Sequence, residues 1–99
     1  RIGWNSKFGY YRSERFDGEL LEILLFIAKS SPANAKQFKS DLMEKVKSLS
    51  SNPLRNRKSE HFDDANIRDY IFKGYTIPYL IDQEKSIIVI LGIYNRNIW

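Results

Sequence analysis

Cysteine is absent from this chain of 99 residues, and His61 is its only histidine. A chain without thiols forms no disulfide, no thiolate-bound zinc or iron–sulfur site and no cysteine nucleophile. One histidine is too few for a histidine metal site. The sequence therefore predicts a protein that works without a metal ion or another cofactor.

Long apolar runs are also missing. The longest, 20–28 and 87–94, are far shorter than the roughly 20 residues that cross a bilayer, so no membrane span is expected. The chain begins without Met and without the apolar core of a signal peptide, so residues 1–6 are interpreted as a processed or engineered start. With 42% hydrophobic and 14% aromatic residues the chain has enough apolar surface to fold, and its length predicts a single domain over residues 1–99.

Two helices are predicted in the first half of the chain. Ser13 is a typical N-cap residue. Apolar residues then recur at helical spacings, at Phe16, Leu20, Ile23, Leu24 and Ile27. Ser31 and Pro32 provide a second helix start, and a similar period follows them. The predicted helices, 14–30 and 32–50, are joined by so short a turn that they must run antiparallel.

After a polar loop the pattern changes to that of strands. Segments 67–72, 75–81 and 86–94 are rich in β-branched and aromatic residues, and a shorter strand is expected near 8–12. Pro78 cannot donate a hydrogen bond to a neighbouring strand, so it is expected at a sheet edge or at a bulge. The predicted fold class is α+β, in the order β-α-α-β-β-β, with the helical hairpin packed on one face of an antiparallel sheet.

Short motifs along the chain resemble one known family in their order and spacing. The motifs are Ser13-Glu14-Arg15-Phe16, Leu24 to Ala28, Ala35 to Phe38, Asn52-Pro53, Ile67-Arg68, Gly74 to Tyr79 and Ile90 to Tyr94. Over about residues 10–99 they resemble the RelE/ParE superfamily of toxins from bacterial type II toxin–antitoxin systems, often called plasmid stabilisation proteins. The resemblance implies a RelE/ParE-like fold and a cytoplasmic bacterial toxin that its cognate, co-encoded antitoxin holds inactive.

Two mechanisms occur in this superfamily. RelE-like members cut messenger RNA on the ribosome, which requires a base, an acid and cations that stabilise the phosphate charge. ParE-like members inhibit DNA gyrase by binding to it. RelE-like toxins commonly have an Arg beside the Tyr of the middle strand, whereas Thr76 follows Tyr75 in this chain. The missing cation favours a gyrase inhibitor over an enzyme. The alternatives are a ribosome-dependent endoribonuclease and a non-toxic domain that only binds antitoxin.

Four residues form the candidate catalytic set of an endoribonuclease: Arg68, Lys73, Tyr94 and Arg96. The first two also have structural interpretations, as an ion-paired strand residue and an ordinary turn lysine. The last two follow the final predicted strand, where members of the superfamily place functional residues. If the chain is a gyrase inhibitor, Tyr94, Arg96 and Trp99 are the expected contacts to the target.

The first predicted helix carries more apolar surface than one neighbour can bury. Leu21, Leu25 and Phe26 widen its apolar stripe beyond the positions that face a single partner. Surface left exposed after packing is expected to bind a helix or strand of the antitoxin. The formal net charge of +4 also favours an anionic partner, either nucleic acid or an acidic protein segment.

Overall fold

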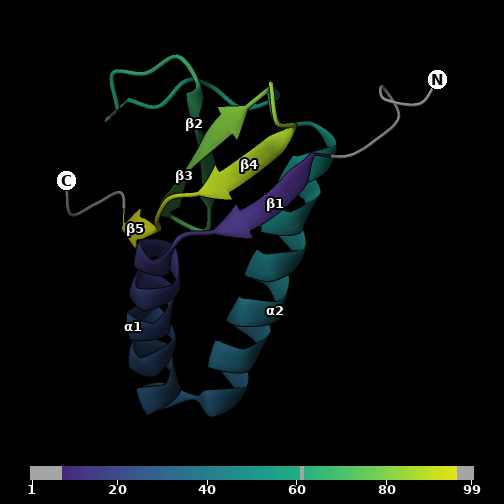
Figure 1. The fold of residues 1–99 in the computed structure, drawn as a ribbon. Helices are drawn as coiled ribbons and strands as arrows, with labels where there is room; N and C mark the ends of the chain where they lie inside the picture. Colours follow the sequence, from purple (N-terminus) through teal and green to yellow (C-terminus); the bar gives the residue numbers. More distant parts are fainter. Residues whose placement is uncertain (1–7, 61, 96–99) are drawn as a thin grey trace.

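The computed structural model describes residues 8–60 and 62–95 as a two-helix hairpin packed against a sheet (Figure 1). The elements are β1 (Gly9–Arg12), α1 (Glu14–Ser30), α2 (Pro32–Ser48), the 3-10 turn η2 (Leu49–Ser51), β2 (Ile67–Phe72), β3 (Tyr75–Asp82), β4 (Ile87–Ile90) and β5 (Tyr94–Asn95). This confirms the predicted α+β class and the order of its main elements, with one additional short strand. None of the helices in the described residues is long and apolar enough to cross a membrane.

Both helices begin where the capping signals predicted. The Ser13 hydroxyl accepts a hydrogen bond from the Phe16 N–H at 3.1 Å, and the Ser31 hydroxyl accepts one from the Asn34 N–H at 3.1 Å. These bonds satisfy N–H groups that a helix leaves free in its first turn. The second helix ends earlier than the predicted residue 50, because the chain tightens into η2 after α2.

The sheet has the strand order β1-β4-β3-β2, and β5 pairs with β3 beyond the end of β4. The pairs β2–β3 and β3–β4 are antiparallel, as predicted, but β1 runs parallel to β4 (Figure 1). The three strands that were predicted to be antiparallel pair in that way, and β1 adds a parallel pair, so the sheet as a whole is mixed. A parallel pair requires a long connection between its strands, and the helical hairpin together with β2 and β3 supplies it.

A β-bulge divides the segment that was predicted as one strand, 86–94. The pairing of β3 with β4 ends with Tyr79 opposite Ile90, and it resumes in β5 with Thr76 opposite Tyr94. Two residues of β3 therefore face three residues of the other strand, 91–93. An extra residue of this kind bends the strand and redirects the side chains that follow it.

Pro78 lies in β3 opposite the start of this bulge. Its carbonyl accepts a hydrogen bond from the Leu91 N–H at 2.9 Å, but the proline has no N–H to return to the Leu91 carbonyl. The Ser13 hydroxyl donates to that carbonyl instead, at 2.9 Å. β3 is a central strand, so Pro78 does not lie at a sheet edge. It lies at a bulge, which confirms the prediction of a sheet edge or a bulge.

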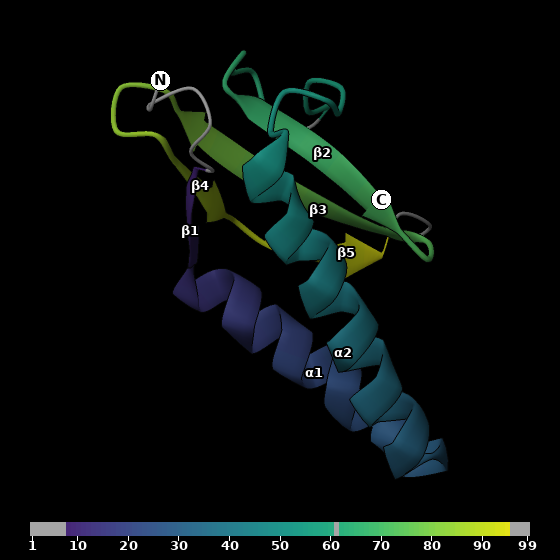
Figure 2. The ribbon, with the colours of Figure 1, turned by 90° about the vertical axis from the view of Figure 1, so that its right-hand side faces the viewer.

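The hydrophobic core lies between α2 and one face of the sheet. Its fully buried side chains are Phe16, Leu42, Val46, Leu49, Ile77, Tyr79, Ile88, Ile90 and Ile93. α1 packs beside α2, and the turn that joins the helices projects beyond the sheet in both views (Figures 1 and 2). The outer half of α1 therefore has no sheet beneath it and keeps a large exposed surface.

Candidate functional site

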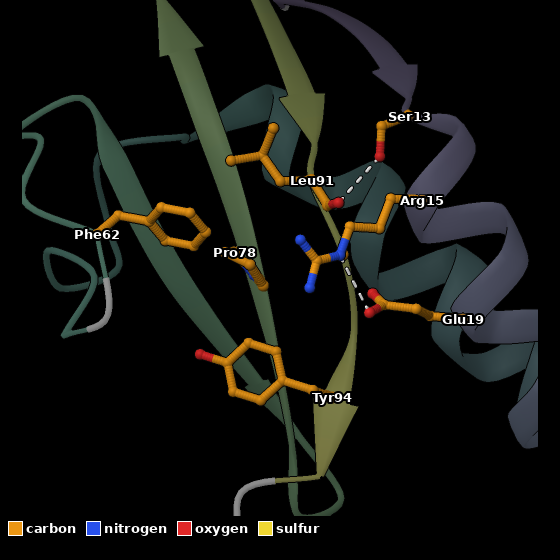
Figure 3. Close-up of a pocket in the computed structure, with 8 residues that line it drawn as sticks. Ser13, Arg15, Glu19, Phe62, Pro78, Leu91 and Tyr94 are labelled. Carbon is orange, nitrogen blue, oxygen red and sulfur yellow. Dashed lines mark hydrogen bonds and ion pairs between the residues drawn. The ribbon is translucent and has the colours of Figure 1, made fainter. Parts of the chain in front are cut away.

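A pocket of about 540 Å³ opens where the first turns of α1 meet the β-bulge (Figure 3). Its lining residues are Ser13, Arg15, Glu19, Phe62, Pro78, Leu91, Gly92 and Tyr94. The walls are mainly apolar, and polar groups come from α1 and from Tyr94. Segments that are far apart in the sequence therefore meet at this pocket, which we call the bulge pocket.

Glu19 connects α1 to the bulge. Its Oε1 atom accepts a hydrogen bond from the Ile93 N–H at 2.9 Å, and its Oε2 atom lies 3.2 Å from Arg15 Nε. Gly92 makes room for this contact, because a Cβ at that position would lie 2.7 Å from Glu19 Oε1. Figure 3 shows the Arg15 guanidinium held over the pocket between Leu91 and Tyr94.

Tyr94 is the first residue after the bulge, and its ring forms part of the pocket wall (Figure 3). Burial raises the pKa of its phenol, and the negative charge of Asp69 raises it further, while a hydrogen bond with Thr76 acts in the opposite direction. The phenol therefore keeps its proton at neutral pH. In that state it is a hydrogen-bond donor and a contact surface rather than a general base.

Arg68, from the candidate catalytic set, lies on the other face of the sheet from Tyr94. Arg68 pairs with Tyr79 and Tyr94 pairs with Thr76, and side chains three positions apart in a strand point to opposite faces. The Arg68 Nη1 atom donates to the Asn56 carbonyl at 2.9 Å. Arg68 thus holds the loop between η2 and β2.

Lys73 lies in the turn between β2 and β3. It has a φ of 48° and the following Gly74 a φ of 85°, as in the two-residue turns of β-hairpins. Its Nζ atom lies 3.6 Å from Asp41 Oδ2 and 5.3 Å from the centre of the Phe72 ring. The structure does not bring Lys73 to Tyr94, and Arg96 lies outside the described residues.

Of the three predicted target contacts, only Tyr94 lies among the described residues. Arg96 and Trp99 lie outside the described residues. No group of three or more metal-binding side chains occurs in residues 8–60 and 62–95.

The three predicted antitoxin contacts are exposed, as the width of the apolar stripe indicated. Leu21 is 55% exposed, Leu25 58% and Phe26 71%. Successive residues of a helix are turned by about 100°, so Phe26 lies on a different flank of α1 from the two leucines. Phe26 lines a second groove of about 420 Å³ between α1 and β5, together with Glu22, Ile23, Tyr75 and others. The predicted antitoxin surface therefore consists of two separate surfaces. We call the groove that Phe26 lines the Phe26 groove, and the side of α1 that carries Leu21 and Leu25 the leucine flank.

Sequence reasoning missed Glu19 and Arg15 as residues of the site. Both were interpreted only as part of the first helix, because their partners lie far along the chain or within the same helix turn. The available signal was Gly92, since a glycine that interrupts an apolar strand pattern indicates a bulge or a close backbone approach.

Comparison with known proteins identifies the family. Residues 10–98 match the model of the family described as ParE toxin of the type II toxin–antitoxin system parDE. No curated protein sequence matches the chain.

Three solved structures have a similar fold. A chain of the chromosomal ParDE system of P. aeruginosa has a TM-score of 0.72 at 16% identity, over 90% of this chain and 96% of that one. A chain of the RelBE2 toxin–antitoxin complex of Mycobacterium tuberculosis has a TM-score of 0.64 at 22% identity, over 92% and 100%. The isolated RelE toxin of E. coli has a TM-score of 0.53 at 18% identity, over 89% and 83%. The family match extends over most of the chain, and so the protein belongs to the ParE toxin family of type II toxin–antitoxin systems, within the RelE/ParE superfamily.

Proposed function

We propose that this toxin acts by binding and inhibiting DNA gyrase, and that a co-encoded antitoxin neutralises it in the bacterial cytoplasm. The observation that carries the proposal is that, among the described residues, the two candidate cations, Arg68 and Lys73, and the pocket residue Arg15 are each held by another group. Arg68 is bound to loop carbonyls, Lys73 is paired with Asp41, and Arg15 is paired with Glu19. A nuclease needs cations that are free to stabilise the extra charge of the phosphate in the transition state.

The charge near Tyr94 also disfavours phosphate. The largest charge effect on its phenol comes from Asp69, a carboxylate that is 2% exposed. Thr76, at the position where RelE-like toxins commonly have Arg, is 4% exposed and lies opposite Tyr94 in the β3–β5 pair. An RNA phosphate placed beside this phenol would meet the Asp69 carboxylate and a neutral hydroxyl, and the nearby Arg15 guanidinium is already paired with Glu19. These surroundings support a protein target rather than RNA cleavage.

The bulge pocket has features of a protein contact. Phe62, Pro78 and Leu91 give it apolar walls, and Arg15 and Tyr94 stand at its polar side (Figure 3). Arginine and tyrosine are enriched among the residues that contribute most to protein–protein affinity, and they act best in pockets from which water is excluded. We therefore assign the gyrase contact to this pocket, with Tyr94 as its main described residue and Arg96 and Trp99 as further contacts.

The antitoxin is assigned to the Phe26 groove. Its apolar side chains, Ile23, Phe26 and Tyr75, come from both α1 and β3, so an inserted helix or strand would contact both layers of the fold. Tyr94 also lines this groove. An antitoxin segment bound there would lie next to the bulge pocket and block the proposed target site.

The test compares two activities of the same purified toxin. We expect it to inhibit DNA supercoiling by gyrase and to leave messenger RNA intact on translating ribosomes. Replacing Tyr94→Ala should weaken the inhibition at least about fivefold, since truncation of a central interface tyrosine typically costs more than about 1 kcal/mol. Arg68→Ala is the matched control, because its side chain lies on the other face of the sheet, and inhibition should persist.

Opposite results would identify the alternatives. Efficient cleavage of ribosome-bound messenger RNA that is lost in Arg96→Ala or Tyr94→Phe would show an endoribonuclease. A protein that has neither activity but binds its antitoxin tightly would be a non-toxic binding domain. Either result would overturn gyrase inhibition.

A further inference from the structure

Asp69 is a buried acid with only one of its two carboxylate oxygens bonded. The residue is 2% exposed. Its Oδ2 atom accepts a hydrogen bond from the Glu60 N–H at 3.2 Å, whereas its Oδ1 atom, also buried, has no hydrogen-bond partner among the described residues. None of the ion pairs in residues 8–60 and 62–95 includes Asp69. A buried charge without a counter-charge destabilises a folded chain, so this carboxylate is better explained by binding than by folding.

The Asp69 side chain lies on the face of the sheet that carries the bulge pocket. Asp69 pairs with Pro78 across β2 and β3. The Asp69 N–H donates to the Arg57 carbonyl, and the Pro78 carbonyl accepts from the Leu91 N–H, so the backbone groups of the pair point away from each other. In such a pair the two side chains are close neighbours on one face of the sheet. Because Pro78 lines the pocket, the carboxylate lies directly behind the pocket wall.

The charged groups that line the pocket or act on the Tyr94 phenol leave one negative charge uncompensated. Two ion pairs, each with a contact of 3.2 Å, are neutral as units: Arg15–Glu19 and Arg57–Glu60. Asp69 is the remaining charge, and it has the largest charge effect on the phenol of Tyr94. Little water screens a buried charge, and apolar walls focus its field into a cleft. The pocket is therefore negative, although the whole chain has a formal net charge of +4.

We infer that the bulge pocket takes a lysine or arginine side chain of the protein target, with Asp69 as the buried counter-charge that selects it. The inference rests on the target contact proposed above for this pocket. A phosphate or an acidic side chain would be repelled by the same field, and a neutral side chain would leave the carboxylate uncompensated. Charge complementarity thus defines the occupant as a cation.

The shape and the walls of the pocket suit a long cationic side chain. Phe62, Pro78 and Leu91 provide apolar surface for its methylene groups. The rings of Phe62 and Tyr94 also offer faces that attract a cation. Figure 3 shows the guanidinium of Arg15 over the pocket between Leu91 and Tyr94, so a group of this kind is compatible with these walls.

Small molecules test the pocket without gyrase. N-propylguanidinium and neutral N-propylurea have nearly the same shape, and NMR shifts of the Gly92, Ile93 and Tyr94 amides measure their binding to the full chain. We expect the cation to bind at least about fivefold more tightly than the urea, because only the cation is attracted to the carboxylate. Asp69→Asn keeps an acceptor for the Glu60 N–H and should abolish the preference. Equal affinities in the parent chain, or no shift of these amides by the cation, would overturn the inference.

Gyrase inhibition tests the occupant. Asp69→Asn should weaken inhibition at least about tenfold. Its midpoint in urea should be unchanged or higher than that of the parent, because the variant removes an uncompensated buried charge. Asp63→Asn is the matched control, since it removes the same charge from an exposed residue of the preceding loop, and inhibition should persist. Inhibition by Asp69→Asn at the level of the parent would overturn the inference.

Two further outcomes separate this inference from the proposed target. A parent chain that prefers N-propylguanidinium but does not inhibit gyrase would support the cation site and show that gyrase is not the target. If Asp69→Asn instead weakens binding of the antitoxin and leaves gyrase inhibition intact, the cation comes from the antitoxin, and the inference is overturned.

Discussion

The Glu19 carboxylate accepts a hydrogen bond from the Ile93 N–H at 2.9 Å, although the two residues are 74 positions apart. The N–H belongs to the bulge between β4 and β5, where strand pairing with β3 is interrupted. A buried N–H that loses its partner in this way needs another acceptor. Glu19 supplies that acceptor from α1, and the bond fixes the strand directly before Tyr94.

We expect Glu19→Ala to lower the free energy of unfolding by about 1–3 kcal/mol, because it leaves the Ile93 N–H without its acceptor. Glu19→Gln should lose less, since its amide oxygen still accepts the bond. Urea unfolding measures both changes, and Glu22→Ala, an exposed acid one helix turn away, is the control. Equal stability of Glu19→Ala and the parent chain would contradict the assigned role.

Gly92→Ala tests the same contact from the other side. The new Cβ would lie 2.7 Å from Glu19 Oε1 and would push the carboxylate away from the Ile93 N–H. We expect a loss of about 1 kcal/mol or more in the parent chain and a much smaller loss in the Glu19→Ala background. Additive losses in this double-mutant cycle would show that the two residues do not act through one contact.

Tyr79 connects the central strand to the loop after η2. Its hydroxyl donates to the Pro53 carbonyl at 2.6 Å and accepts from Asn56 Nδ2 at 3.1 Å, and the side chain is fully buried. Tyr79→Phe should therefore cost about 1–3 kcal/mol in urea unfolding. Tyr75→Phe is the control on the same strand, because the Tyr75 hydroxyl has no hydrogen bond among the described residues, and it should be nearly neutral.

Alkaline pH should weaken the same contact. Burial raises the pKa of the Tyr79 phenol above its ordinary value of 10.0. The unfolded chain then releases this proton at lower pH than the folded chain does. The stabilisation is complete below pH 10 and is lost as the pH rises through the folded pKa. Urea unfolding between pH 8 and 11 should show the difference between parent and Tyr79→Phe shrinking above pH 10, and a constant difference would contradict this.

Arg68 and Lys73 should differ in their effect on stability. Arg68→Ala removes a charged hydrogen bond to the Asn56 carbonyl, which costs about 1.5–3 kcal/mol. Lys73→Ala removes a partly exposed ion pair with Asp41, which costs at most about 1 kcal/mol. Thermal or urea unfolding of the two variants measures the order. If Arg68→Ala were as stable as the parent, its proposed role in holding the loop would be wrong.

The Phe26 groove should dominate binding of the antitoxin. Truncation of an aromatic anchor at the centre of an interface costs about 2 kcal/mol or more, so Phe26→Ala should raise the antitoxin Kd at least about thirtyfold. Leu21→Ala, on the leucine flank, should change it little. Calorimetric titration with the purified antitoxin measures both. A larger effect of Leu21→Ala would assign the antitoxin to the leucine flank instead.

Local signals in the sequence determined the helices, most strand positions and the fold class. Ser13, Ser31 and Pro32 specify helix starts through bonds and dihedral angles within a few residues, and the apolar period specifies the buried face. Pro78 indicated a sheet edge or a bulge in the same local way, because a missing N–H is a property of the residue itself. Gly92 carried a similar local signal, its missing Cβ, but 86–94 was predicted as one strand.

Only the tertiary structure decided the parallel pairing of β1 with β4, the separation of Phe26 from the leucine flank and the convergence of Arg15, Glu19 and Tyr94. Each depends on how elements far apart in the sequence pack together. The period of α1 shows which residues share a face, but the side on which α2 and β5 lie determines which face stays open. Likewise, nothing in the sequence distinguishes Glu19 from the other acidic residues of α1. Only the fold places the Ile93 N–H 2.9 Å from its carboxylate.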